Sequence, residues 1–238
     1  MTIHQHPRYG LGNFIMITPA IKRLSEKTGA PVDVFFSIEY VKQCFLDCEF
    51  INIVEKKGES IIESNIINTD IPDYEYAFEK ITGEPWSEDY HTYTDSPKEF
   101  DFSEKEYIVV LNGLAGSYWK GKKEVDKNHH LLISDISNVP VYFTGSDTDV
   151  SQNTPWATDV FDECFIGDIR QSLAIIRDAK KVIANDTGLS HAAGSMNKDM
   201  LILWKDTPFE KNQNPGANTR YSKKGSWSDD IENFLSKN

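Results

Sequence analysis

Residues 182–191 begin with a short apolar run, continue with a polar, glycine-containing turn and end at the start of a helical pattern. In open parallel sheets, ligands bind where strands end, and the free N–H groups at a helix start attract phosphate. Thr187 would add a hydroxyl donor, Gly188 would let the backbone approach a diphosphate, and Asp186 would accept hydrogen bonds from sugar hydroxyls. A helix cap at Asp186 or Thr187 explains the same residues equally well, so this segment alone leaves both interpretations open.

Two further segments carry residues of a similar chemical kind. The segment Gly10-Leu11-Gly12-Asn13 lies between an expected strand and an expected helix, although two glycines also fit an ordinary tight turn. Residues 117–123 follow a strand that ends at Asn112 and contain Lys120 and Lys122. A lysine there would neutralise a diphosphate leaving group, whereas a solvent-exposed lysine run is an equally good interpretation.

Few side chains in these segments are able to move a proton. His191 lies one turn into the helix expected after Thr187, where it either faces a ligand or packs inside. Asp168 precedes another expected helix and is a candidate both for its N-cap and for a general base. His129 and His130 are expected at the surface, and the spacing supports no Ser–His–Asp arrangement.

The elements that must position these residues alternate between strand and helix, which predicts parallel α/β sheets. Strands are expected at 2–5, 32–36, 51–54, 107–112, 139–143, 182–184 and 200–204. Helices are expected at 14–27, 41–46, 124–136, 169–179, 189–195 and 228–235. Pro19 should kink or shorten the first helix, and Gly29 should end it. We expect an N-terminal domain of residues 1–102, in which the stretch from residue 55 onward is largely irregular, and a C-terminal domain of residues 103–238.

The composition is that of a globular protein without a strong basic surface. Of 238 residues, 39% are hydrophobic and 26% are charged, and the net charge is −12. Residues 55–106 alone hold fifteen acidic and five basic side chains, which excludes a uniformly basic nucleic-acid binder and leaves only the lysines of 120–127 as a local basic patch. The sequence shows no apolar run of membrane-spanning length, no signal-peptide pattern, no metal-binding cluster and no CxxC pair among its three cysteines. We therefore expect a cytoplasmic protein with free thiols and no metal.

Taken together, the segments resemble glycosyltransferase family 9, the heptosyltransferase family. Residues 10–21 are similar to that family's Leu-Gly-Asp turn and Thr-Pro-Ala-Leu helix, and residues 185–193 to its Asp-Thr-Gly-x-x-His-x-x-Ala signature. Residues 203–208 resemble its Gly-Pro-Thr-Asp-Pro-type turn with changes. The likeness extends over residues 7–36 and 107–215, and the two main motifs in the correct order are more specific together than either is alone.

The resemblance implies a GT-B-like fold, in which two Rossmann-like parallel-sheet domains face a cleft and the second binds most of the donor. It also implies an inverting, metal-independent transfer from a nucleoside-diphosphate sugar, with no cofactor. The donor-binding residues that it implies are Gly12, Lys120, Lys122, Ser146, Asp147, Asp186, Thr187 and Gly188. Of the lysines in 120–123, we prefer Lys120 to Lys122 as the phosphate contact, and we place Ser146 and Asp147 near the nucleoside.

The chain departs from the family at the presumed general base, where Asn13 stands in place of the aspartate. An amide cannot take a proton at neutral pH. Either Asp168 or His191 then acts as the base, or the acceptor is itself acidic, or catalysis is lost. The N-terminal domain, which recognises the acceptor in the family, is also reduced, so the acceptor is open among glycans, proteins, small molecules and modified nucleobases.

Three functions remain as hypotheses. A glycosyltransferase is the leading one, and the acidic stretch 55–106 disfavours a nucleic-acid acceptor for it. A catalytically silent nucleotide-sugar-binding or regulatory protein is the alternative, which Asn13 and the reduced N-terminal domain favour. A sugar-nucleotide epimerase or hydrolase is the third, and it would consume donor in the absence of an acceptor.

Overall fold

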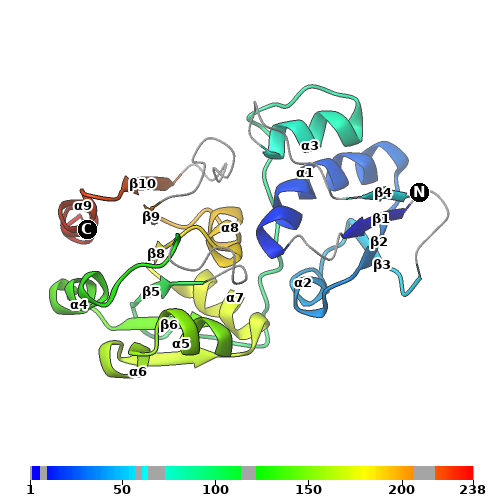
Figure 1. Cartoon of the computed structure of the whole chain (residues 1–238). Coiled ribbons are helices and arrows are strands. Elements are labelled where there is room, and N and C mark those ends of the chain that lie inside the picture. Colours follow the sequence, from blue (N-terminus) through cyan, green and yellow to red (C-terminus); the bar gives the residue numbers. More distant parts are fainter. Residues whose placement is uncertain are drawn as a thin grey trace. The chain divides into compact units, whose positions relative to one another are not determined.

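The computed structural model of the chain describes residues 2–5, 10–56, 61–63, 73–113, 122–205 and 218–237. These residues form two compact units, of which the first runs up to Asp95 and the second begins at Ser96 (Figure 1). Each unit contains one sheet, and all pairings between neighbouring strands are parallel. The expectation of an α/β fold built on two parallel sheets is confirmed.

The first unit is a four-stranded sheet with the strand order β3-β2-β1-β4. Its elements are β1 (Thr2–Gln5), α1 (Leu11–Thr28), β2 (Val32–Phe36), α2 (Glu39–Gln43), β3 (Ile51–Ile53), β4 (Ile61–Glu63) and α3 (Asp73–Thr82). The ring of Phe14 on α1 lies 4.8 Å from that of Phe36 and 4.9 Å from that of Phe45, between ring centroids. Because β1 lies between β2 and β4, the strand order reverses there, which is the position where such sheets bind ligands.

Helix α1 starts earlier than the apolar periodicity predicted. It begins at Leu11, after Gly10 as an extended N-cap, so Gly12 and Asn13 lie in its first turn and not in a turn ahead of the helix. A glycine inside a helix costs about 1 kcal/mol relative to alanine, but burial of Leu11 and Phe14 offsets that cost. Tertiary packing therefore overrides the local glycine signal at this helix start.

Helix α1 also continues through Pro19, which we expected to kink or shorten it. Proline has no N–H group, so the carbonyl of Ile15 loses its usual helical partner. The buried hydroxyl of Thr18 donates to that carbonyl at 2.7 Å, and it accepts the backbone N–H of Tyr93 at 2.8 Å. Thr18 thus replaces the missing bond and ties α1 to a distant segment, and the helix ends as expected at Gly29, whose φ is 69°.

The stretch expected to be mostly irregular, residues 55–106, contains both β4 and α3. Helix α3 packs against α1, and its Phe78 is almost fully buried. The ring of Phe78 lies 5.5 Å from Trp86 and 4.2 Å from Tyr90, between centroids. The buried residues of α3 are Ala77, Phe78 and Ile81, and such a short apolar face within an acidic stretch gives only a weak helical pattern.

The second unit is a six-stranded sheet with the strand order β10-β9-β8-β5-β6-β7. Its strands are β5 (Ile108–Leu111), β6 (Val141–Gly145), β7 (Glu163–Ile166), β8 (Lys181–Ala184), β9 (Met200–Trp204) and β10 (Thr219–Lys223). Its helices are α4 (Lys127–Ile136), α5 (Asp147–Asn153), α6 (Ala157–Val160), α7 (Ile169–Asp178), α8 (Gly188–Ser195) and α9 (Trp227–Leu235). Three strands lie on either side of the β5–β8 junction, which is the Rossmann order with its switch point between β5 and β8.

Helices cover both faces of this second sheet (Figure 1). Helices α4 and α9 pack together on one face, and α7 and α8 pack together on the other. His130 on α4 is buried, contrary to the expected surface position, and Trp156 Nε1 donates to its Nδ1 at 3.1 Å. Burial lowers the pKa of His130 to about 4, so the ring is neutral inside the core.

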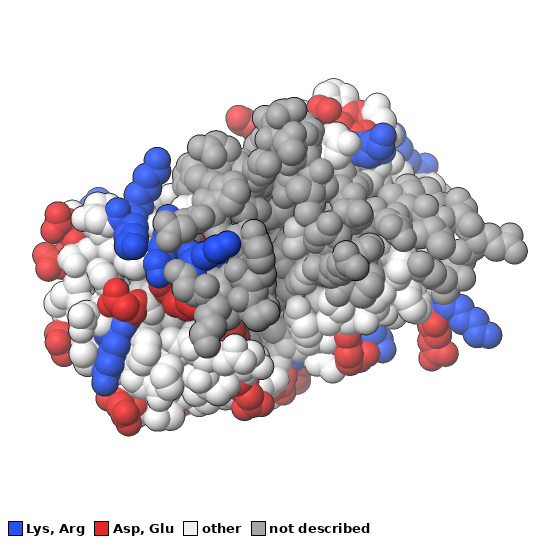
Figure 2. Space-filling model, viewed as in Figure 1, with Lys and Arg blue, Asp and Glu red and all other residues white. Residues whose placement is uncertain are grey.

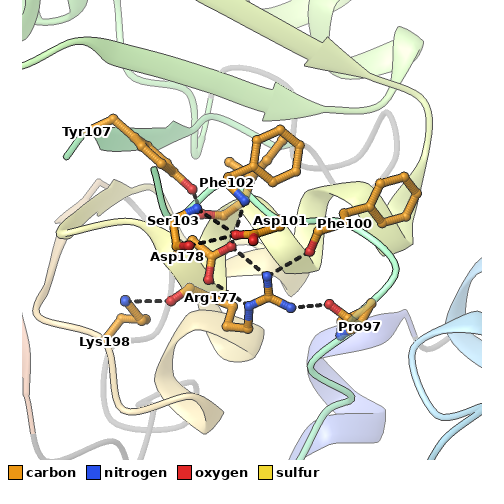
Figure 3. A network of polar contacts seen from close by, with 10 residues as sticks. Pro97, Phe100, Asp101, Phe102, Ser103, Tyr107, Arg177, Asp178 and Lys198 are labelled. Atoms are coloured by element: carbon orange, nitrogen blue, oxygen red, sulfur yellow. Dashed lines mark hydrogen bonds and ion pairs between the residues drawn. The ribbon is translucent and has the colours of Figure 1, made fainter. Parts of the chain in front are cut away.

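Figure 3 shows how the chain is fastened as it enters the second unit. The guanidinium of Arg177, at the end of α7, donates to the backbone carbonyls of Pro97 and Phe100 and to the carboxylate of Asp178. Asp178 in turn accepts the backbone N–H of Phe102 at 3.0 Å. Burial would raise the pKa of Asp178, but the hydrogen bonds from Arg177 and Phe102 outweigh burial and lower it. Residues 97–102 are thus anchored to α7.

Asp95, the last described residue of the first unit, is fully buried and is also held by several hydrogen bonds. Its N–H donates to the carbonyl of Cys44 at 2.9 Å, and its carboxylate accepts the N–H of Asp47 at 2.8 Å and the Tyr93 hydroxyl at 3.3 Å. Exposed Ser96 is the single residue between these anchors and those that hold Pro97.

Two expectations from composition concern the described part of the chain. Within it, no helix is long and apolar enough to cross a membrane. Cys44 and Cys48 are buried free thiols, and Cys164 is a partly exposed one. Burial raises the pKa of Cys48 to about 12, so this thiol is unreactive at neutral pH.

Candidate functional site

The candidate site lies at the carboxyl ends of β5 and β8, the two neighbouring strands at the switch point of the second sheet. Leu111 and Ala184, the last residues of these strands, are paired with each other. Asn112 and Gly113 follow the first strand, and residues 185–187 follow the second. Parallel pairing therefore brings the two polar segments to the same edge of the sheet.

A buried ion pair is the central feature of this edge. Lys123 Nζ lies 2.6 Å from Asp186 Oδ2, and the two side chains are only 9% and 7% exposed. His191 Nε2, on α8, lies 3.8 Å from the other carboxylate oxygen of Asp186. Burial on its own would raise the pKa of Asp186, but His191 and Lys123 outweigh burial and hold it below its ordinary value. Asp186 is therefore a carboxylate at neutral pH, with an ammonium beside it.

The start of α8 adds backbone N–H groups to the same edge. Thr187 is the extended N-cap residue, its N–H donates to the Ser190 hydroxyl at 3.2 Å, and that hydroxyl donates to the Thr187 carbonyl at 2.7 Å. Gly113 faces Thr187 so closely that a Cβ at residue 113 would lie 2.3 Å from Thr187 Oγ1. Only glycine fits between the strand ends at this position, which the sequence pattern did not reveal.

The lysine of this site differs from the two singled out in the sequence. Lys120 lies outside the described residues, and Lys122 is partly exposed. Lys123 is the member of the run that meets Asp186, and it stands three residues before Asp126, the N-cap of α4. The phosphate contact expected of Lys120 or Lys122 stays a prediction, and the ion pair of Lys123 makes this neighbouring lysine a further candidate.

Ser146 and Asp147 follow β6, the strand beside β5, as expected. Ser146 caps α5: its hydroxyl accepts the N–H of Asp149 at 3.2 Å, and the Asp149 carboxylate accepts the N–H of Ser146 at 2.9 Å. Asp147 is exposed in the first turn of α5. The polar group of Ser146 is thus already engaged in a capping box, and a nucleoside contact there stays a prediction.

The three residues expected to be catalytic, Asn13, Asp168 and His191, occupy different environments. Asp168 is the exposed N-cap of α7, and its Oδ1 accepts the N–H groups of Arg170 at 2.9 Å and Gln171 at 3.2 Å. His191 is buried beside Asp186, in the candidate site itself. Asn13 and Gly12 belong to the first unit, so within the second unit the described site contains His191 but neither of them.

Charge on the described surface does not form a single-sign region in the view of Figure 2, where acidic and basic side chains are interspersed. Among the described residues, no group of three or more histidine, cysteine or acidic side chains is arranged to hold a metal ion. The charges that the described site does concentrate are those of the Lys123–Asp186 pair.

The fold is that of a GT-B-like α/β protein, and the candidate site lies at the switch point of its Rossmann-ordered sheet. The chain is similar to the E. coli heptosyltransferase WaaC with ADP, with a TM-score of 0.73 and 12% identity over 99% of both chains. It is also similar to the E. coli ADP-heptose LPS heptosyltransferase II, with a TM-score of 0.75 and 11% identity over 98% of this chain and 97% of that one.

A third similar structure is the family 9 glycosyltransferase from Veillonella parvula, with a TM-score of 0.72 and 12% identity over 99% of this chain and 89% of that one. No protein-family model and no curated protein matches the sequence. At these identities the likeness establishes a shared fold, and it confirms the heptosyltransferase-like architecture that the motifs implied.

Proposed function

We propose that the chain is a glycosyltransferase whose second unit binds a nucleoside-diphosphate sugar at the ends of β5 and β8. The observation that carries the proposal is the buried pair of Lys123 and Asp186, 2.6 Å apart, at the switch point of the sheet. The pair offers an ammonium to phosphate and a carboxylate to sugar hydroxyls, where open α/β sheets bind their ligands. One heptosyltransferase of this fold was solved with ADP, which supports an ADP-sugar as the first donor to test.

In this proposal an acceptor hydroxyl attacks the anomeric carbon, the bond from that carbon to the diphosphate oxygen breaks, and the configuration inverts. Lys123 and the N–H groups at the start of α8 stabilise the negative charge that grows on the leaving diphosphate. Asp186 accepts hydrogen bonds from hydroxyls of the donor sugar. A cationic side chain and a helix N-terminus here take the place of a metal ion.

The general base of this transfer is assigned to His191 in preference to Asp168. A base must reach the proton it abstracts, and an adjacent carboxylate orients and stabilises an imidazole that accepts a proton. His191 has Asp186 as that carboxylate, whereas Asp168 uses its Oδ1 oxygen to cap α7. Asn13 is left to position the acceptor or the donor sugar, because its amide cannot take a proton.

The proposal is tested by donor binding. Thermal shift and calorimetry with ADP, UDP, GDP and the corresponding nucleotide sugars should identify a ligand that raises the melting temperature, since it binds only the folded state. Lys123→Met and Asp186→Asn should each weaken its binding by about 10- to 100-fold, because each removes a charged partner. Lys180→Met is the matched control, since Lys180 is an exposed lysine of the same unit that pairs with Glu106.

Wild-type affinity in both site variants, or an equal loss in the control, would sink the assignment. Product formation is then followed with the identified nucleotide sugar and a panel of glycan, protein and small-molecule acceptors. Donor consumption without any acceptor would instead indicate a hydrolase or epimerase.

A second candidate function is a nucleotide-sugar-binding protein without turnover. The observation that favours it is the first turn of α1, which contains Asn13 and no acidic residue. Such a protein would bind the nucleotide sugar through the same Lys123–Asp186 pair but yield no product with any acceptor. Tight donor binding in calorimetry, combined with no transfer over the acceptor panel, would establish this candidate in place of the transferase.

A further inference from the structure

We infer that Asn185 is a positioning residue that holds Lys123 on Asp186, and that Asn112 supports it from the neighbouring strand. The inference rests on the proposed donor site, but it concerns which groups set the lysine in place. Asn185 and Asn112 are the first residues after β8 and β5, and neither side chain is exposed at all. Neither belongs to the donor contacts that the motifs imply.

The amide of Asn185 acts on the backbone of two residues that are far apart in the sequence. Its Nδ2 donates to the carbonyl of Gly113 at 2.7 Å and to the carbonyl of Lys123 at 3.2 Å. Asp186, the next residue, holds the ammonium of the same lysine. Two consecutive residues after β8 thus hold Lys123: Asn185 binds its backbone carbonyl, and Asp186 pairs with its Nζ.

Asn112 fastens the chain two residues further on. Its Oδ1 accepts the N–H of Val125 at 3.0 Å, and its Nδ2 donates to the carbonyl of Val125 at 3.2 Å. The same Nδ2 lies 3.0 Å from the hydroxyl oxygen of fully buried Thr154. The backbone from Lys123 to Val125 is therefore held by the side-chain amides that follow the two strands of the switch point.

Burial of the Asn185 side chain costs stability, because one of its polar atoms has no partner. Its Oδ1 is buried and has no hydrogen-bond partner in the described structure. A buried acceptor without a partner is destabilising, so stability by itself does not favour an amide here. What the amide supplies is two donors aimed at the carbonyls of Gly113 and Lys123, and these define the position of the lysine.

A double-mutant cycle without ligand tests the inference directly. The coupling free energy between Lys123 and Asp186 is obtained from the urea unfolding of Lys123→Met, Asp186→Asn and the double variant. The cycle is measured once in the wild-type background and once in a protein that also carries Asn185→Ala. We expect Asn185→Ala to reduce this coupling by about half or more. Asn153→Ala is the matched control, because Asn153 is a buried amide of the same unit whose side chain makes no hydrogen bond in the described structure. Should Asn185→Ala fail to fold, Asn185→Ser serves in its place, because a serine hydroxyl has a single hydrogen and cannot donate to both carbonyls.

Ligand binding separates this inference from the proposed function. If ADP binds the wild type, Asn185→Ala should weaken it by about tenfold, and by less than about twofold in the Lys123→Met background, because its effect passes through the lysine. Equal losses in both backgrounds, or an unchanged Lys123–Asp186 coupling, overturn the positioning role while leaving the donor site intact. A reduced coupling together with ADP binding that Lys123→Met does not affect supports the positioning of the pair and overturns the donor site.

Discussion

The two units use the same parallel-sheet design but fill the edge at which the strand order reverses with different chemistry. In the first unit the end of β1 carries Gln5, whose Oε1 accepts the N–H groups of Ser37 at 3.0 Å and Ile38 at 3.1 Å. In the second unit the end of β8 carries Asp186, which is paired with Lys123. A buried neutral amide in one unit and a buried ion pair in the other thus lie at the carboxyl end of a strand that borders the reversal of its sheet.

The difference supports the proposal that the charged donor binds to the second unit. Burying an ion pair carries a desolvation penalty that a neutral amide avoids, so such a pair is weak evidence for stability and better evidence for function. Among the described residues of the first unit, an ion pair of comparable geometry lies near the surface, where Glu84 meets Arg23 and Lys27 at 2.7 and 2.8 Å. Substitutions in each unit test this contrast between a buried ion pair and a buried neutral amide.

The largest effect on stability is expected from Asp186→Ala. It leaves the buried ammonium of Lys123 without its partner and should lower the free energy of unfolding by about 3–5 kcal/mol. Adding Lys123→Met should restore part of that loss, because the uncompensated charge is then gone. The free energy of unfolding of the single and the double variant is measured with urea. A loss below about 1 kcal/mol for Asp186→Ala would show that the Lys123–Asp186 pair behaves as an exposed ion pair and not as a buried one.

Thr18→Val should have the next largest effect, in the neutral first unit. It removes the hydroxyl that serves the Ile15 carbonyl and the Tyr93 N–H, at a cost of about 2–4 kcal/mol. Adding Pro19→Ala should recover part of the loss, because an N–H at residue 19 can bond to Ile15 again. Thr18→Ser keeps the hydroxyl and is the control, and thermal unfolding that shows no rescue by Pro19→Ala would contradict this account of the helix.

Asn13→Asp tests whether the first unit tolerates a negative charge in the first turn of α1, the helix that follows β1. A carboxylate in the first turn of α1 interacts favourably with the helix dipole, so we expect a gain of about 0.5 kcal/mol in unfolding free energy. Turnover measured with the identified donor should rise if no other group acts as base. Unchanged turnover would instead support His191 in that role, and a destabilised protein would contradict the expected tolerance.

Glu84→Gln should have the smallest effect. The hydrogen bonds from Arg23 and Lys27 lower the pKa of Glu84 from 4.5 to about 2, so its contribution is present above pH 4.5 and is lost as the pH falls towards 2. This exposed network is screened by salt, so the fall in melting temperature at neutral pH should disappear at high ionic strength. Glu79→Gln, on the exposed face of α3, is the control, and a loss that persists in high salt would remove the contrast with the buried pair.

The sequence predicted those parts of the fold where a local pattern decides the structure. Strands β1, β2 and β9 have the predicted bounds, and Asp168 caps α7 as proposed. Strands β7 and β10 were missed because they are partly exposed edge strands of mixed polarity, as residues 219–223 illustrate. Ser146 and Asp149 have the spacing of a capping box, and this local signal also marks the start of α5, a helix that was not predicted.

The site was predicted in part for the same reason. The strand-to-helix step at Asp186 is a local signal, and it correctly pointed to the carboxyl edge of the sheet. The ion pair of Lys123 joins residues that are 63 positions apart, and the contacts of Asn112 and Asn185 likewise join segments that are distant in the sequence. Such contacts between distant residues have no periodic trace in a single sequence.

The anchoring of Asp95 and of Pro97 has a consequence for the backbone between them. The proline ring fixes φ of Pro97 and biases Ser96 towards extended conformations, which restricts the torsions on the carboxyl side of Ser96. The conformational freedom of the backbone between the two anchored residues is therefore confined to one exposed serine, and a glycine at position 96 would increase it.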